Sequence, residues 1–167
     1  MEADELRALQ APLKEQYKQH PEAAVITLSA KGTLGEEGVT CSVETGKALV
    51  EAGLHPATGG DGLSACSGDM LLQALAACAG VTLRAVATAL DIPVAGGSVH
   101  AEGDLDFRGT LGVDREAAVG FTDIRLRFDL DSAASEEQLA TLFKLTERYC
   151  VVYQTLTRSP AVTLTNR

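Results

Sequence analysis

The sequence contains no cluster of lysine or arginine, and its formal net charge is −9, with 14 basic and 23 acidic residues. Proteins that hold a nucleic-acid backbone or an anionic membrane need concentrated positive charge. We therefore expect neither nucleic acid nor a membrane as a partner. The acidic balance otherwise indicates only solubility.

A secretory signal and a long hydrophobic run are also missing. The chain begins MEADELRALQ, which is charged rather than basic and then apolar. The most apolar stretch, 70–83, contains Gln73 and is closed by Arg84, whereas a membrane span needs about 20 apolar residues. The sequence therefore predicts a cytoplasmic protein without a membrane span.

The cysteines and histidines lack the spacing of a metal site. The four cysteines are Cys41, Cys66, Cys78 and Cys150. They form no CxxC pair and the three histidines are not clustered, so we expect no metal. Permanent disulfides are rare in the cytosol. This leaves buried free thiols or redox-active ones.

The 167 residues, 46% of them hydrophobic, are enough for one domain with a real core. Leucines and Tyr17 recur at helical spacing over 3–18, and Pro12 predicts a kink or two short helices. Strands are predicted at Val25–Ala30 and Val39–Val43, joined by a turn at Gly35–Gly38.

The rest of the chain alternates helices with strand pairs. A loop at 55–68 precedes a long helix that starts near Gly68 or Asp69 and ends before Pro93. Alternating apolar and polar residues predict strands at Ser98–Phe107 and Phe121–Leu130. One helix over 135–156, which begins with a Ser135/Gln138 capping box, and a closing strand at 161–165 complete the predicted elements.

This order of elements favours an α+β domain with antiparallel sheet around central helices. The first long helix is apolar over most of its circumference, so it must be covered on nearly all sides. In a chain of 167 residues, that need for coverage favours a second subunit.

Both helical cysteines face apolar surroundings. At about 100° per residue, Cys78 lies about 140° from Gln73, which belongs to the one polar stripe of the long helix. Cys150 shares a face with Leu139 and Phe143. If the two helices pack together, the thiols meet. A free cysteine is more often a packing residue, and burial in apolar surroundings makes a thiol inert, so spacing alone leaves both interpretations open. Arg84 falls in the polar stripe, which predicts an exposed position or a salt bridge.

Two motifs resemble those of the OsmC/Ohr family. The stretch SGDMLLQALAACAGVTLRAVATAL resembles the family helix in which a run such as ALAAC carries the reactive cysteine. The stretch ERYCVVYQTLTRSPAVTL resembles its second cysteine motif, with Val151 in the usual place of a proline. The motifs occur in the family order, so we expect an OsmC-like domain over 21–167 and an N-terminal helical extension over 1–20.

The resemblance implies an intertwined homodimer in which antiparallel sheets from both chains wrap two central helices. It also implies reduction of organic hydroperoxides, without metal or other cofactor. Cys78 would be the attacking thiolate and become a sulfenic acid, and Cys150 would resolve it to a disulfide. An external dithiol would then reduce that disulfide.

The sequence departs from the peroxidase pattern at the groups that activate the thiol. Those members use an arginine from the early strands and a glutamate upstream of the cysteine. This chain has no arginine between Arg7 and Arg84, and Gly68 stands in the glutamate's place. The auxiliary candidates are Arg7, Lys31, His55, the adjacent Asp69, and Cys66, which a helix N-terminus would make more acidic.

Two hypotheses follow from these motifs and gaps. The first is a cysteine-based organic hydroperoxide reductase. The second is a relative with the same fold that binds a small apolar ligand between subunits without peroxidase chemistry. We interpret Cys41, which alternates with outward-facing strand residues, as a core residue.

Overall fold

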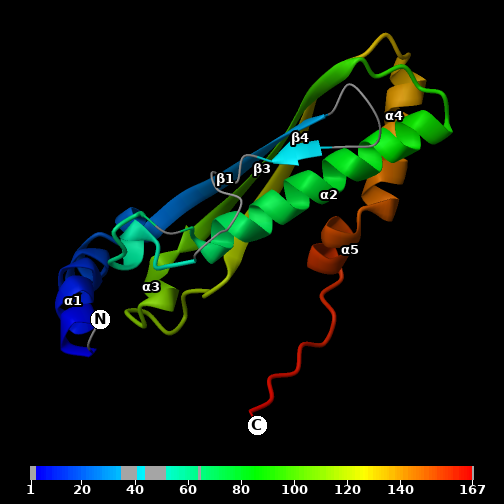
Figure 1. Cartoon of the computed structure of the whole chain (residues 1–167). Helices are drawn as coiled ribbons and strands as arrows, with labels where there is room; N and C mark the ends of the chain where they lie inside the picture. The colour runs from blue at the N-terminus through cyan, green and yellow to red at the C-terminus, as the bar shows by residue number, and fades with distance from the viewer. Residues whose placement is uncertain (1–2, 35–40, 44–51, 64, 167) are drawn as a thin grey trace. The chain divides into compact units, whose positions relative to one another are not determined.

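A computed structural model describes residues 3–34, 41–43, 52–63 and 65–166 (Figure 1). Along the chain the elements are α1 (Ala3–Gln19), the 3₁₀ turn η1 (Pro21–Ala24), β1 (Val25–Leu34), β2 (Cys41–Val43), the 3₁₀ turn η2 (Pro56–Thr58), α2 (Ser67–Ala89), β3 (Gly96–Asp106), α3 (Phe107–Thr110), β4 (Phe121–Asp131), α4 (Glu136–Tyr149) and α5 (Val151–Thr157).

The strands form an antiparallel sheet in the order β2-β1-β3-β4. The β1 and β2 strands pair antiparallel, with Gly32 opposite Val43. In the next pair, Ala95 N–H donates to the Asp131 carbonyl at 2.9 Å and Thr122 Oγ1 donates to the Asp104 carbonyl at 3.1 Å, so β3 and β4 also run in opposite directions. The predicted α+β class with antiparallel sheet is confirmed.

The chain divides into two compact units. The first unit comprises Met1–Ala30, Glu44–Gln73 and His100–Arg127, and the second comprises Lys31–Val43, Ala74–Val99 and Phe128–Arg167. In the first unit, α1 is held against η2 because the Tyr17 hydroxyl donates to the Ala57 carbonyl at 2.8 Å. Tyr17 is itself buried, so this bond satisfies a polar group that would otherwise destabilise the fold.

The second unit is built around the apolar faces of α2 and α4. Its fully buried side chains are Leu75, Ala76, Ala79, Leu83, Val99, Leu142 and Cys150. The rings of Phe128 on β4 and Phe143 on α4 pack with their centroids 5.6 Å apart. Burial of side chains of this size contributes about 1.5–3 kcal/mol each, and this core includes one of the two predicted reactive cysteines.

Three helical predictions need correction. The α1 helix continues through Pro12 as one element rather than as two short helices, because a proline removes only one intrahelical hydrogen bond and the helix gains packing in the first unit. The predicted helix over 135–156 is two helices, since Cys150 adopts an extended conformation (φ −70°, ψ 106°) between α4 and α5. Arg84 is buried rather than exposed, and its guanidinium donates to the Val94 carbonyl.

The predicted closing strand at 161–165 is also wrong for the single chain. These residues have no strand conformation, and the side chains of Val162 and Leu164 are 90% and 95% exposed. An alternating apolar pattern forms a strand only where a neighbouring strand completes its hydrogen bonds. The predicted turn at Gly35–Gly38 lies outside the described residues.

The α2 helix is long and apolar enough to cross a membrane by length and composition, and half of its most apolar window is buried. A core helix of a soluble protein passes the same test, so this finding carries little weight. The absence of a membrane span and the cytoplasmic location stay predictions.

Candidate functional site

The second unit brings the two predicted reactive cysteines together. Cys78 lies half-buried on α2, and Cys150 lies fully buried at the junction of α4 and α5. Their side chains form a hydrogen bond. The packing of two helical faces, which the sequence could only suggest, therefore places the thiols in contact.

Burial raises the pKa of the Cys150 thiol to about 11, and the hydrogen bond and negative charge of Cys78 act in the same direction. The backbone N–H groups of Tyr153 and Val152 oppose this and lower the pKa. At neutral pH, Cys150 is therefore a protonated thiol.

The position of Cys150 follows from its neighbours along the chain. The Ser135/Gln138 capping box, which the sequence predicted, fixes the start of α4. Ser135 N–H donates to Gln138 Oε1 at 2.9 Å, and Gln138 N–H donates to Ser135 Oγ at 3.2 Å. At the other end, Cys150 N–H donates to the Thr146 carbonyl and the Cys150 carbonyl accepts from Gln154 N–H, both at 2.9 Å. Cys150 therefore ends one helix and begins the next.

Sequence reasoning missed the residues that brace this junction. The Tyr153 hydroxyl donates to Glu147 Oε1 at 3.1 Å, and Gln154 Nε2 donates to the Glu147 carbonyl at 2.8 Å. Both bonds cross the break at Cys150. Only Val151 in the usual proline place hinted that the helix would break there, since a proline interrupts a helix.

Thr146 is a second residue that the sequence did not mark. It lies one helical turn before Cys150, is 2% exposed, and its Oγ1 has no hydrogen-bond partner among the described residues. A buried hydroxyl without a partner is costly and uncommon in folded proteins. The Thr146 carbonyl accepts the Cys150 N–H, so Thr146 helps to position the Cys150 backbone.

His55 and Cys66 lie in the first unit, where they line a pocket of about 400 Å³. The His55 ring stacks on Phe107 at 5.0 Å with 16° between the ring planes, and its Nδ1 accepts the Ala57 N–H at 3.0 Å. The Cys66 carbonyl accepts the Met70 N–H at 3.1 Å, so Cys66 is the N-cap residue of α2. Asp69 is in the first turn of the same helix.

Asp69 and His55 interact electrostatically. Burial raises the pKa of the Asp69 carboxyl above its usual value, and the charge of His55 partly counters that shift. Two residues proposed as auxiliaries on sequence grounds therefore act on each other. The other two, Arg7 and Lys31, fall on α1 and β1, but their side chains lie outside the described part of the structure, as does that of Cys41.

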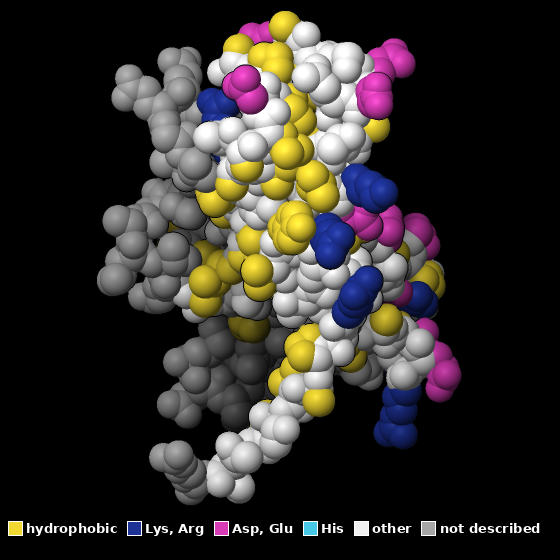
Figure 2. All heavy atoms as spheres, turned by 90° about the vertical axis from the view of Figure 1, so that its right-hand side faces the viewer, with side chains coloured by type: hydrophobic (Ala, Val, Ile, Leu, Met, Phe, Trp, Pro, Cys, Tyr) yellow, Lys and Arg dark blue, Asp and Glu magenta, His cyan; other side chains and the backbone are white. Residues whose placement is uncertain are grey.

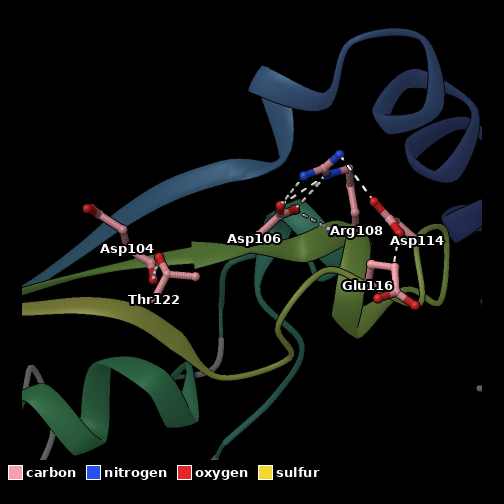
Figure 3. A network of polar contacts seen from close by, with 6 residues as sticks. All are labelled: Asp104, Asp106, Arg108, Asp114, Glu116 and Thr122. Atoms are coloured by element: carbon pink, nitrogen blue, oxygen red, sulfur yellow. Dashed lines mark hydrogen bonds and ion pairs between the residues drawn. The ribbon is translucent and has the colours of Figure 1, made fainter.

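A polar network in the first unit surrounds Arg108 of α3, and sequence reasoning also missed it (Figure 3). Arg108 Nη2 pairs with Asp106 Oδ2 at 2.6 Å and its Nη1 with Asp114 Oδ2 at 3.5 Å. The Asp106 side chain also caps α3 by accepting the Arg108 N–H at 3.0 Å. The Arg108 hydrogen bond lowers the pKa of Asp106. The network fixes the short helix that presents Phe107 to His55.

Within the described residues, no group of three or more His, Cys, Asp or Glu side chains is arranged to hold a metal ion. The chemistry that the described site offers is thiol chemistry at the Cys78/Cys150 pair.

Comparisons with known proteins agree on one family. A family model described as OsmC-like protein matches residues 59–165. The crystal structure of an OsmC-like hydroperoxide resistance protein from Jannaschia sp. CCS1 superposes with a TM-score of 0.56 at 17% sequence identity, covering 83% of this chain and 91% of that one. No curated protein matches the chain. At this identity the neighbour shows the fold alone.

Proposed function

The chain belongs to the OsmC-like protein family, and on that basis we propose that it reduces organic hydroperoxides with Cys78 and Cys150 as its redox pair. The observation that carries this proposal is the hydrogen bond between the two thiols, one of them fully buried. The structural neighbour is titled a hydroperoxide resistance protein, which is consistent with this function.

The reaction uses two thiol steps. The Cys78 thiolate attacks one oxygen of the hydroperoxide, the O–O bond breaks, and the alcohol leaves after taking a proton while Cys78 becomes a sulfenic acid. The Cys150 sulfur then attacks the Cys78 sulfur, an S–S bond forms, and the sulfenic oxygen leaves as water with the Cys150 proton. An external dithiol reduces the disulfide by exchange, which returns two electrons and two protons.

The electrostatics of the pair suit this order of events. Cys150 has a pKa of about 11 and remains protonated at neutral pH, so it does not compete as the attacking thiolate. The apolar core residues around Cys150 favour organic hydroperoxides over hydrogen peroxide, because apolar surface gains free energy when it leaves water.

We also propose that the active form is a homodimer, with the OsmC-like domain over 21–167 and residues 1–20 as an extension. Large hydrophobic side chains are exposed in groups, as one face shows (Figure 2). In the second unit they include Val81 at 38% and Leu90 at 46% exposure, together with Val162 and Leu164. Apolar surface of this kind is typical of an interface between subunits.

The test is consumption of cumene hydroperoxide with dithiothreitol as the reductant. Cys78→Ser should abolish turnover, whereas Cys66→Ser, a matched change on the first unit, should preserve it. One equivalent of peroxide should also lower the mass by two hydrogens, with the disulfide mapped to Cys78–Cys150. Arg7 and Lys31 remain proposed activators of Cys78, and Arg7→Ala and Lys31→Ala test them in the same assay.

Full activity of Cys78→Ser would refute the proposed chemistry. Absence of activity in the unmodified protein would favour the alternative, a relative that binds a small apolar ligand between subunits. Gly68 in the place of the family glutamate is the observation that favours that alternative.

A further inference from the structure

The first unit contains a binding site that the thiol chemistry of Cys78 and Cys150 does not use. Its pocket has a volume of about 400 Å³, within the range of sites that hold small organic molecules. All the described residues that line it belong to the first unit, while both redox cysteines belong to the second.

The walls of the pocket are mainly apolar. The hydrophobic side chains come from the segment before η2, the start of α2, the end of β3, the start of α3, and β4 with the residues just before it: Leu54, Leu71, Leu105, Phe107, Val119 and Phe121. Two of these side chains are phenylalanines, and the Phe107 ring stacks on the His55 ring. A flat ring gains both apolar burial and stacking in such surroundings.

Several of the polar groups at the pocket can donate hydrogen bonds. His55 Nδ1 accepts the Ala57 N–H, so in the neutral ring the proton is on Nε2, which can donate. Ser67 and Gly68, which line the pocket, belong to the first turn of α2, where backbone N–H groups lack intrahelical acceptors. These donors favour an accepting group such as a carbonyl.

Asp69 follows the pocket-lining residues Ser67 and Gly68 in the chain and contributes a carboxyl group beside them. Its carboxyl lies in the same first turn and interacts with His55. A negative charge there repels an anion that the helix N-terminus would otherwise attract. We therefore propose that the pocket binds a small, uncharged aromatic molecule that carries a carbonyl-type hydrogen-bond acceptor, with its ring beside Phe107 and its acceptor toward His55.

The half-buried Cys66 thiol lines the same pocket and reports on its occupancy. The probe is N-phenylsuccinimide, which has a phenyl ring and two imide carbonyls and does not react with thiols. N-ethylsuccinimide keeps the carbonyls and lacks the ring, and phenylcyclopentane keeps the ring and lacks the carbonyls. The readout is the rate at which N-ethylmaleimide labels Cys66, mapped by peptide mass spectrometry in the full chain.

We expect saturable protection of Cys66 by N-phenylsuccinimide at concentrations about tenfold lower than N-ethylsuccinimide requires, because the ring adds buried apolar area. Phenylcyclopentane should protect less well than N-phenylsuccinimide. Equal protection by N-phenylsuccinimide and N-ethylsuccinimide, or none by either, would overturn the aromatic site. Equal protection by phenylcyclopentane would overturn the role of the acceptor.

A pair of glycine substitutions separates a filled pocket from a general effect on folding. Gly120 lines the pocket, Gly96 does not, and a Cβ atom at either position would meet no atom within 4 Å. Gly120→Phe should abolish protection, whereas Gly96→Phe should leave it unchanged. Protection that survives in Gly120→Phe would contradict the site. Peroxide turnover is independent of this result, so failure here leaves the proposed function standing.

Discussion

The side chains of Cys150, which is fully buried, and Cys78 form a hydrogen bond, and this bond joins the junction of α4 and α5 to α2. The same burial that makes Cys150 a poor thiolate couples the stability of the second unit to pH.

Alkaline pH should destabilise the protein through Cys150. Its folded-state pKa of about 11 lies above the ordinary value of 9.0, so the stabilisation is complete below pH 9 and is lost as pH rises toward 11. The free energy of unfolding should fall by about 2–3 kcal/mol, because the folded-state and ordinary pKa values of Cys150 differ by about two units. Urea unfolding at pH 7.5, 9 and 10.5 measures it, and Cys150→Ala should flatten the dependence. An equal slope in Cys150→Ala would contradict the assignment.

Thr146→Val should stabilise the protein by about 1 kcal/mol. The substitution replaces a buried hydroxyl that has no partner among the described residues with a methyl group of the same size. Thr155→Val is the control, because the Thr155 hydroxyl is exposed and donates to the Val151 carbonyl at 2.8 Å. The midpoint of urea unfolding is the measurement. A destabilised Thr146→Val would show that the hydroxyl has a partner in solution.

Acid should weaken the first unit through Asp106. Arg108 lowers the Asp106 pKa below 3.8, so this stabilisation is present above the ordinary pKa and is lost as pH falls through the folded-state value. Asp106→Ala should cost about 1 kcal/mol at pH 7, since it also removes the cap of α3. Arg108→Lys keeps the positive charge but not the forked geometry of the guanidinium. It should therefore retain only part of the stabilisation that Arg108 gives through Asp106. Acid titration of unfolding tests both variants.

The C-terminal segment should control assembly. Val162→Asp with Leu164→Asp should shift a homodimer toward monomer in sedimentation velocity, because two side chains that are 90% and 95% exposed in the single chain would carry charge into the interface. Leu63→Asp, which changes a residue 81% exposed in the first unit, should leave the sedimentation coefficient unchanged. A monomer in the unmodified protein would contradict the proposed homodimer.

The cysteine helices show how far sequence reasoning reached at the site. Periodicity placed Cys78 and Cys150 on apolar faces, and the motifs around them identified the family that the comparisons confirm. The break at Cys150 was not predicted, because 135–156 reads as one helix without it. The Thr146 hydroxyl was also unmarked, since burial of one polar atom depends on contacts distant in sequence.

The sequence by itself determined the order of the main helices and strands as far as α4, the antiparallel strand pairs and the capping box at Ser135, because these follow from hydrophobic period and from side chains a few residues apart. Only the tertiary structure decided that Arg84 is buried against the Val94 carbonyl and that His55 stacks on Phe107. Only there do the thiols of Cys78 and Cys150 meet. Such contacts join distant parts of the chain, and local patterns do not specify which apolar faces pack against each other.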